Sequence, residues 1–407
     1  MKEPAILVLQ DGTIFHGYNS GTDGYVIGEI VFNTSMTGYQ EILTDPSYAD
    51  QLIAFTYPHI GNVGVNIDDE ESKNIYAKGV ILKNISNISS NYRSTKNLLQ
   101  YIKEKKIIVI SNIDTRKLTR ILRNRGSQYG CIQSNKYINI QHALKKIKSY
   151  KSKKQIELTK YVGTKKYING LILVIIYIIK NKNNYFNDTK KYKEKITCSC
   201  IRFRCKKNIL NILNKKGCQI TLVPYYTPIN ILIKLKPSGV LLSNGPGDPR
   251  LCTDTIKCVK KILKLHIPIF GICLGHQILA LAAGAEIKKM KFGHHGSNHP
   301  VQNINTKHVF ITSQNHNFTI NPNTINKNII VTHVSLFDQT IQGIKLYKKI
   351  HLVFRDTQKP VRALMILKNY LINLLKICVI RKNYAKKNRY KKNINLRIRT
   401  YYYWASM

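Results

Sequence analysis

The residue best suited to chemistry in this sequence is a cysteine with a glycine two positions away on each side. It is Cys273, in the run Gly271-Ile272-Cys273-Leu274-Gly275. An apolar segment typical of a buried strand precedes the run, and residues 278–283, rich in helix formers, follow it until Gly284. This layout indicates a nucleophile elbow, a tight strand-to-helix turn whose helix N-terminus favours a thiolate and offers N–H groups to an oxyanion. The five residues alone fit an ordinary buried cysteine at a strand–turn–helix junction equally well.

The segments around Cys273 predict a parallel sheet. A helix at 206–213, strands at 219–223 and 239–243, a helix at 255–265 and a strand at 267–270 alternate along the chain. Such alternation is typical of parallel strands joined by right-handed crossovers. The glycine-rich loop Asn244-Gly245-Pro246-Gly247 and the Cys273 turn both leave the C-terminal ends of strands, where sites form in open α/β sheets.

Residues 1–150 indicate a separate mixed α/β domain. We expect strands at 5–9, 13–18, 51–56 and 106–110, a hairpin turn at Asp11-Gly12, and a helix from the N-cap residue Asp114 to Gly126. The passage 28–48 is dense in Gly, Thr, Ser and Asn, which favours loops. Residues 151–195, rich in Lys, Asn and Tyr without a clean period, are predicted to be a linker.

The composition is strongly basic. The chain has 407 residues, enough for two domains, and carries 65 Lys plus Arg against 21 Asp plus Glu, a net charge of +44. Nucleic acid or an acidic membrane would be natural partners for such a charge. However, Lys, Asn, Ile and Tyr, the residues of A- and T-rich codons, crowd every part of the chain, and no basic motif of a nucleic-acid module is present. We therefore expect no nucleic-acid partner; a salt-dependent affinity for DNA or RNA would support the alternative.

Cysteine usage and hydropathy predict a cytoplasmic protein. Nine cysteines are scattered along the chain, and no signal peptide precedes the strand-like start, so we expect no disulfides. The apolar run Leu171–Ile179 is too short to span a bilayer, which favours no membrane association.

Two motifs of the second half, taken together, resemble the class I (triad-type) glutamine amidotransferases. They are the runs 243–249 (Ser-Asn-Gly-Pro-Gly-Asp-Pro) and 271–277 (Gly-Ile-Cys-Leu-Gly-His-Gln). Within that class, residues 28–48, 56–64, 113–116 and 291–301 resemble the small subunit of carbamoyl-phosphate synthetase, whose N-terminal domain other class members lack. The resemblance implies an N-terminal mixed α/β small-subunit domain and then a flavodoxin-like amidotransferase domain with a mainly parallel sheet, at 196–376.

The resemblance also implies a function. Small subunits of this family hydrolyse glutamine, and the ammonia passes to a large subunit, which uses ATP, magnesium and bicarbonate to make carbamoyl phosphate for arginine and pyrimidine synthesis. No cofactor is expected in the small subunit itself. Cys273 matches the nucleophile that attacks the glutamine amide to give a thioester. The positions that match glutamine-binding or pocket-shaping residues of the family are Ser47, Gly245, Gly247, Leu274, Gln277, Asn315, Asn317 and Phe318.

Three features of the sequence allow a second interpretation besides the one that the family resemblance implies. Asn317 stands where the family usually has glycine, and asparagine tolerates a left-handed backbone, so a backbone contact could survive there. The histidines of residues 294–299 have the spacing of metal ligands, but the family reading is loop structure behind the site. Cys198, Cys200 and Cys205 also allow a metal cluster. We expect no metal in either place.

The match fails where the triad should be completed. The thiol needs a base and a carboxylate that orients the base, which the family supplies in a late His-Pro-Glu segment. By spacing, Thr357 stands at the position of the His and Lys359 at that of the Glu. Threonine is no base at neutral pH, and lysine carries the wrong charge.

A disrupted reading frame explains this failure. With third bases chosen to fit, the codons of residues 356–367 can be read in another frame as Arg-Tyr-Pro-Glu-Ala-Ser-Pro-Gly-Pro-His-Asp-Ser, close to the family's His-Pro-Glu segment. The same test turns residues 199–205 into the family's first amidotransferase strand. The linker is then out of frame too, and the basic tail 377–407 is an overrun toward the start of a large subunit.

Two functions follow: an ammonia-donating subunit, or a catalytically dead one that only supports the large subunit.

If the frame is intact, the expressed protein will have a mass of 46.8 kDa and end in residues 384–407 as printed. We expect intact-mass spectrometry, with resequencing of the gene, to show a different mass. A mass that matches the printed chain would contradict the frame hypothesis.

Overall fold

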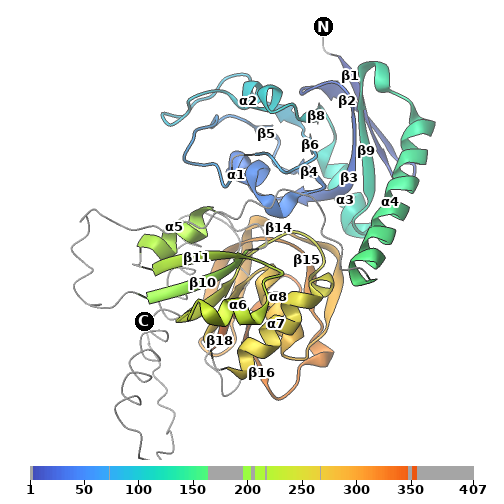
Figure 1. Cartoon of the computed structure of the whole chain (residues 1–407). Coiled ribbons are helices and arrows are strands. Elements are labelled where there is room, and N and C mark those ends of the chain that lie inside the picture. The colour runs from blue at the N-terminus through green and yellow to red at the C-terminus, as the bar shows by residue number, and fades with distance from the viewer. Residues whose placement is uncertain are drawn as a thin grey trace, which may run out of the picture.

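The protein folds into two domains stacked one above the other (Figure 1). The computed structural model describes residues 3–72, 74–163, 196–202, 207–215, 218–265, 267–346 and 351–354. No helix in these ranges is both long and apolar enough to cross a membrane.

A closed barrel with the strand order β1-β2-β8-β6-β4-β3-β9 forms the centre of the N-terminal domain. Its strands are β1 (Pro4–Leu9), β2 (Ile14–Asn19), β3 (Tyr25–Asn33), β4 (Gln51–Phe55), β6 (Gly79–Ile81), β8 (Ile108–Ser111) and β9 (Tyr129–Ser134). Beside it lie α1 (Tyr39–Thr44), the short 3-10 helix η1 (Pro46–Tyr48), α2 (Leu98–Glu104), α3 (Thr115–Arg125), a second 3-10 turn (Asn135–Tyr137), α4 (Ile140–Gly163) and a two-stranded sheet of β5 (His59–Ile60) and β7 (Asn84–Ile85).

Alternating side chains of the barrel strands serve two cores. On β3, Ile30 belongs to the cluster that contains Leu7 and Ile132, whereas its neighbour Val31 packs with Leu43 and the α1 and α2 side chains. Successive side chains of a strand point to opposite faces, so this period of two fills the barrel and also covers its outside. Helix α4 closes another side of the barrel.

Several local predictions for this domain are confirmed. β1 and β2 form the expected hairpin, and Gly12 in its turn has a φ of 87° that glycine adopts without strain. Helix α3 begins after Asp114, whose carboxylate accepts a hydrogen bond from the Lys117 N–H at 2.9 Å, and it ends at Gly126.

Two expectations for the first half were wrong. The loops predicted across 28–48 are largely regular, because buried residues such as Ile30 and Val31 draw residues 25–33 into β3. Likewise, the boundary expected at residue 150 falls inside α4, which continues through Gly163. The loop-forming composition of residues 28–48 was misleading because packing in the barrel and against α1 and α2 decides that segment.

The second domain is a sheet of nine described strands in the order β11-β10-β12-β13-β18-β17-β16-β14-β15. Its parallel half contains β11 (Cys218–Pro224), β10 (Ile196–Arg202), β12 (Gly239–Leu242), β13 (Ile269–Ile272) and β18 (His351–Phe354); its antiparallel half contains β17 (Ile341–Leu346), β16 (Ile329–Ser335), β14 (Ile287–Asn303) and β15 (Val309–Ile320). In chain order the parallel half is 2-1-3-4-5, the flavodoxin-like order. The predicted α/β fold class is confirmed.

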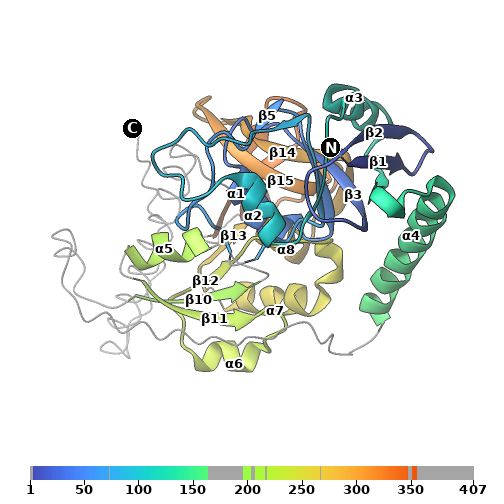
Figure 2. The same cartoon turned by 90° about the horizontal axis from the view of Figure 1, so that it is seen from above.

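Helices cover both faces of the parallel half. α6 (Ile229–Lys234), α7 (Thr253–Lys264) and α8 (Leu274–Ala282) lie on one face, and α5 (Lys207–Lys215) lies on the other (Figure 2). Leu232, Val259 and Ile278, one from each of the first three helices, share a core with the sheet. The two central parallel strands, β12 and β13, are buried along their whole length and contain no polar side chain, as is typical of strands covered on both faces.

The structure also corrects two predictions in this domain. The frame hypothesis implied that residues 199–205 cannot supply the first strand, yet β10 runs over Ile196–Arg202 between β11 and β12. Residues 294–299, expected in a loop, lie within the long strand β14 because they pair with β15.

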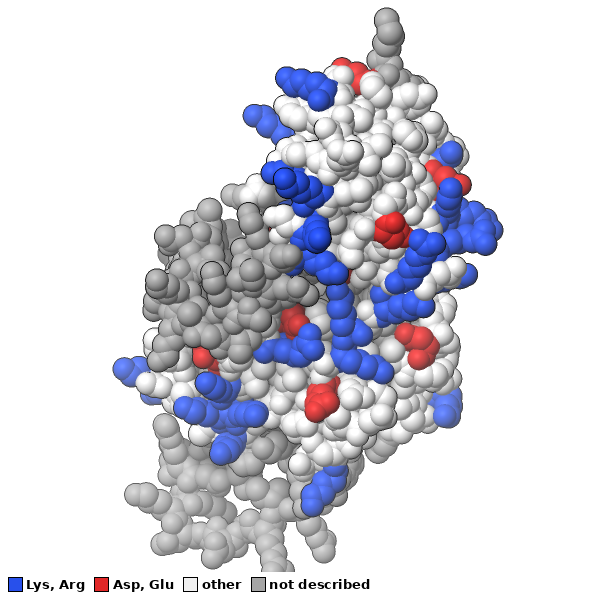
Figure 3. All heavy atoms as spheres, turned by 90° about the vertical axis from the view of Figure 1, so that its right-hand side faces the viewer, with Lys and Arg blue, Asp and Glu red and all other residues white. Residues whose placement is uncertain are grey.

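Charge is spread unevenly over the surface. On the face that carries α4, Lys and Arg side chains are scattered over both domains, with Asp and Glu side chains between them in smaller patches (Figure 3). The absence of a nucleic-acid partner stays a prediction.

Replacing the helix cap of α3 tests the fold locally. We expect Asp114→Ala to lower the free energy of unfolding by about 1 kcal/mol, because the Lys117 N–H loses its acceptor. Denaturant titration followed by circular dichroism measures the change. Asn124→Ala, on the exposed side of the same helix, serves as the control and should cost nothing; equal losses in both variants would contradict the capping role.

Candidate functional site

Cys273 occupies a strained turn between β13 and α8. Its backbone has φ 51° and ψ −104°, an unfavourable combination for a residue with a side chain. The strand ends at Ile272 and the helix starts at Leu274, so the thiol stands at the N-terminus of α8. The predicted nucleophile elbow is therefore present in the geometry.

The two flanking glycines make this turn possible. A Cβ atom on Gly271 would lie 2.6 Å from the Gly275 carbonyl carbon, and one on Gly275 would lie 2.6 Å from the Leu242 Cβ atom. Real Cβ atoms essentially never come so close to such neighbours. Helix α8 thus packs its first turn directly on the end of β12, where the glycine-rich loop begins.

The thiol is enclosed by residues from three separate segments. Cys273 is 3% exposed, and its Sγ lies 3.5 Å from the backbone carbonyl oxygen of Asn315 on β15, which accepts the thiol hydrogen. Tyr48 of the N-terminal domain is buried nearby, with its hydroxyl 2.7 Å from the Asn33 Nδ2 donor. Burial, and to a lesser extent the charges of Asp45 and Cys273, raises the pKa of Tyr48 well above its ordinary value. The Tyr48 phenol therefore stays neutral, within electrostatic range of Cys273.

Ser47 links the N-terminal domain to the glycine-rich loop. Its hydroxyl accepts a hydrogen bond from Asn244 Nδ2 at 3.1 Å, and its N–H donates to Asp45 Oδ1 at 2.9 Å, so η1 is fixed against the loop. Gly245, next in the loop, is buried, and Gly247 is exposed with φ 96°. Three of the positions matched to glutamine binding thus lie along one contact between the domains.

The remaining predicted positions surround the first turn of α8. Leu274 is buried in the domain core, and the Gln277 Nε2 donates to the Phe318 carbonyl oxygen at 2.8 Å. The guanidinium of Arg250 lies 5.6 Å from the centre of the Phe318 ring. The contacts to β15, to Phe318 here and to Asn315 from the thiol, connect these positions with Cys273.

Two residues around the site, Tyr48 and Asn244, were not selected from the sequence. Asn244 stands inside a motif already noticed, and Tyr48 directly follows Ser47. Adjacency to a selected residue was the available signal for both. His295 was noticed in the histidine group 294–299, but its contact with Asn315 could not be read from the sequence because it depends on the pairing of β14 with β15.

Comparisons with known proteins place the chain. Residues 7–132 match the family described as "Carbamoyl-phosphate synthase small chain, CPSase domain", and residues 202–353 match "Glutamine amidotransferase class-I". A carbamoyl phosphate synthase small chain from Buchnera aphidicola subsp. Baizongia pistaciae is 55% identical over 343 residues, 84% of this chain and 85% of that protein. The chain belongs to the carbamoyl-phosphate synthase small chain family.

Two further relatives with the same name show similar coverage. The small chain from Buchnera aphidicola subsp. Acyrthosiphon pisum is 51% identical over 86% of this chain and 89% of its own length. The one from Wigglesworthia glossinidia brevipalpis is 49% identical over 91% of this chain and 96% of its own length. Both domains of the fold are therefore shared with the carbamoyl-phosphate synthase small chains.

Asn317, which stands where the family usually has glycine, does not adopt the expected left-handed backbone. Asn317 lies within β15 and does not adopt a positive φ; across the ladder, Gly293 does, with φ 71°. The pairing of β14 with β15 is irregular between Lys289 and His294, and this irregularity leaves the unusual conformation to the glycine. The idea that Asn317 acts as a left-handed stand-in for glycine is wrong.

The sheet brings β18 alongside the elbow. β18 runs parallel to β13 with Phe354 opposite Ile272, the residue that precedes Cys273. The C-terminal end of β18 thus reaches the same edge of the sheet as the thiol. Thr357 and Lys359, the residues expected at the base and acid positions, lie outside the described residues.

The histidines near the site form hydrogen bonds and ring contacts. His294 bonds Asp338 and Gln314 at 3.0 and 2.9 Å, and its ring lies 5.0 Å from that of His299. Within the described ranges, no group of three or more His, Cys, Asp or Glu residues has an arrangement that could hold a metal ion. Cys205 lies outside the described residues.

Adding a methyl group to the elbow tests its packing. We expect Gly275→Ala to lower the free energy of unfolding by more than about 3 kcal/mol, beyond usual overpacking, because the Cβ meets backbone atoms of Leu242 that cannot move aside. Gly247→Ala is the matched control: its Cβ meets nothing within 4 Å, so only the positive φ should cost about 1–2 kcal/mol. Equal costs, measured by denaturant unfolding, would contradict the close approach of α8 to β12.

Proposed function

We propose that the chain is the glutamine-hydrolysing small subunit of a carbamoyl-phosphate synthase. The observation that carries the proposal is Cys273, a cysteine held at a helix N-terminus with the matched glutamine-binding positions around it. Ser47 of the N-terminal domain, Gln277 of α8 and Asn315 of β15 would hold glutamine from three sides. Family membership supports this assignment.

The proposed reaction starts with attack of the Cys273 thiolate on the side-chain amide carbon of glutamine. The oxyanion that forms would be stabilised by free N–H groups at the start of α8, including that of Leu274, and by the loop at Gly245. The C–N bond then breaks, ammonia leaves with an added proton, and a thioester remains. Water hydrolyses the thioester to glutamate and frees the thiol.

The ammonia would serve a large subunit. That partner would combine it with bicarbonate and ATP, in the presence of magnesium, to make carbamoyl phosphate for arginine and pyrimidine synthesis in the cytoplasm. The small subunit itself would need no cofactor, because hydrolysis of an amide by a thiol uses protein side chains, backbone N–H groups and water.

A second candidate is a subunit that binds the large subunit without turning over glutamine. Thr357 and Lys359, at the positions matched to the base and acid, favour it. Without a base, the thiol is not activated, and the leaving ammonia lacks its usual proton donor. Binding and oxyanion donors alone sustain only a small fraction of the rate.

Ammonia release from glutamine distinguishes the two candidates. With the large subunit present, an active chain will release ammonia, and Cys273→Ser will abolish the release because a hydroxyl is a far weaker nucleophile than a thiolate. Cys258→Ser, at a buried cysteine of α7, should keep the wild-type rate. Absence of release in the wild type, unchanged by Cys273→Ser, contradicts the enzyme and supports the structural subunit.

The base can also be supplied by substitution. If the matched positions are right, the double variant Thr357→His with Lys359→Glu should raise ammonia release by about 100-fold or more, the usual contribution of a placed general base. Thr357→Val with Lys359→Leu is the control without ionisable groups. Equal rates in the two double variants would contradict the assignment of these positions.

A further inference from the structure

His295 is a buried histidine held between two asparagine side chains. Its ring is 2% exposed, its Nδ1 lies 2.7 Å from Asn315 Oδ1, and its Nε2 lies 2.9 Å from Asn317 Oδ1. The histidine belongs to β14 and both asparagines belong to the adjacent β15. The ring therefore joins the two strands by side-chain contacts in addition to the ladder.

The charge state of His295 fixes the direction of these hydrogen bonds. Burial lowers its pKa to about 4, although the hydrogen bonds to the two asparagines oppose the shift. A neutral imidazole has one N–H donor and one acceptor nitrogen, so it cannot donate to two amide oxygens. One of the two asparagine amides must present its NH₂ group to the ring.

Asn315 is the amide that has to turn. Asn317 Nδ2 is 3.5 Å from Glu29 Oε2, an acceptor, so Asn317 Oδ1 faces the ring and receives the Nε2–H. By contrast, Asn315 Nδ2 is buried without a hydrogen-bond partner among the described residues. Rotating that amide gives Nδ1 a donor and removes an unpaired buried N–H group, and the two orientations are nearly indistinguishable by shape.

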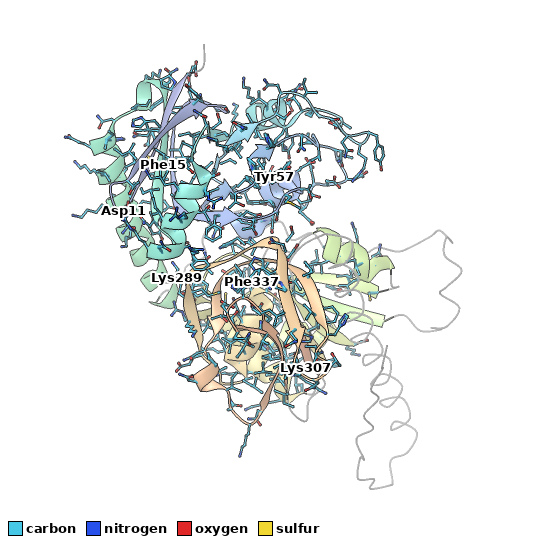
Figure 4. The ribbon with its side chains drawn as sticks, turned by 180° about the vertical axis from the view of Figure 1, so that it is seen from behind. Asp11, Phe15, Tyr57, Lys289, Lys307 and Phe337 are labelled. Carbon is cyan, nitrogen blue, oxygen red and sulfur yellow. The ribbon has the colours of Figure 1, made fainter. Side chains whose placement is uncertain are left out.

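The two asparagines connect His295 to residues on two sides. Toward the site, the backbone carbonyl of Asn315 accepts the Cys273 thiol hydrogen at 3.5 Å. Toward the N-terminal domain, Asn317 reaches Glu29, whose carboxylate is also paired with Lys289 at 2.9 Å. Lys289 lies where the two domains meet (Figure 4).

A second contact ties the histidine itself to the N-terminal domain. The His295 carbonyl accepts a hydrogen bond from the Thr34 N–H at 3.2 Å, and the ring centre lies 6.2 Å from that of Tyr48. Both Thr34 and Tyr48 come from the segment that follows β3. The histidine is thus connected to the N-terminal domain through its backbone as well as through Asn317.

We propose that His295 is a positioning residue for the Cys273 thiol, because it fixes Asn315 beneath the sulfur and couples that strand to Glu29 of the N-terminal domain. We name this set the His295 relay: Glu29, Asn317, His295, Asn315 and Cys273. The role in glutamine hydrolysis rests on the proposed function, but the placement of the thiol does not. The family usually has glycine at position 317. The part of the relay from His295 through Asn317 to Glu29 is therefore a feature of this chain.

The decisive experiment measures the reactivity of one thiol. The rate of Cys273 alkylation by iodoacetamide is followed by peptide mass spectrometry in the full chain, with and without glutamine, for the wild type and His295→Phe. Phenylalanine keeps a ring of similar size and removes both hydrogen bonds. We expect alkylation at least threefold faster in His295→Phe, because Asn315 no longer holds the thiol in its closed position.

A second buried pair provides the matched controls. His333 is 2% exposed, burial also lowers its pKa to about 4, and its Nε2 lies 3.2 Å from Asn303 Nδ2. His333→Phe and Asn303→Gly should leave Cys273 alkylation at the wild-type rate. His295→Gln retains a donor and an acceptor. Its Cys273 alkylation rate should lie at least halfway back from the His295→Phe rate to the wild-type rate.

Asn317→Gly covers the case in which His295→Phe does not fold. This substitution removes the partner of His295 Nε2 and introduces the residue usual in the family. It should also raise the Cys273 alkylation rate, by a smaller factor than His295→Phe. A wild-type rate in a folded His295→Phe, or in Asn317→Gly if the first variant is unfolded, would falsify the proposal. An equal rise in the His333 and Asn303 controls would overturn it as well, because the effect would then be general loosening.

Glutamine separates this proposal from the proposed function. If the chain binds glutamine, it will slow Cys273 alkylation in the wild type, and His295→Phe will weaken that protection. Absence of protection in the wild type counts against glutamine binding, whereas the alkylation rates without glutamine still decide the role of His295.

Discussion

The close contact of Gly275 with Leu242 is the constraint on which the site depends. It sets the first turn of α8 on the end of β12, and only a residue without a side chain permits it. Because the helix starts there, Cys273 is forced into its strained conformation, and the free N–H groups of α8 lie next to the glycine-rich loop. Nucleophile, oxyanion donors and loop are placed by one packing contact.

The N-terminal domain completes the surroundings of the thiol. Ser47 holds Asn244, the Tyr48 ring lies against His295, and Glu29 and Thr34 reach β15 and β14 through Asn317 and His295. These contacts join residues separated by more than 190 positions in the chain. The site is therefore shared between the domains, and small shifts between them would be felt at Cys273.

Elements set by interactions between residues close in sequence were predicted correctly, and elements set by distant pairing were not. Helix α3 was predicted correctly because a cap and a glycine stop act over a few residues. By contrast, β3, β10 and the histidine strand β14 were mistaken for loops or for lost strands, since their pairing partners lie far away in sequence. A polar or basic composition was misleading wherever a ladder of backbone hydrogen bonds and a buried face outweighed it.

By itself, the sequence determined the elbow, the glycine-rich loop and the order of strands and helices, because these depend on residue types at short spacing. It also determined that Thr and Lys stand at the positions matched to the base and acid. Only the tertiary structure decided that Asn315 contacts the thiol, that His295 and Tyr48 lie behind Asn315, and that Phe354 is paired with Ile272. Those relations arise from sheet register and domain packing, which join distant segments and leave no local mark in the chain.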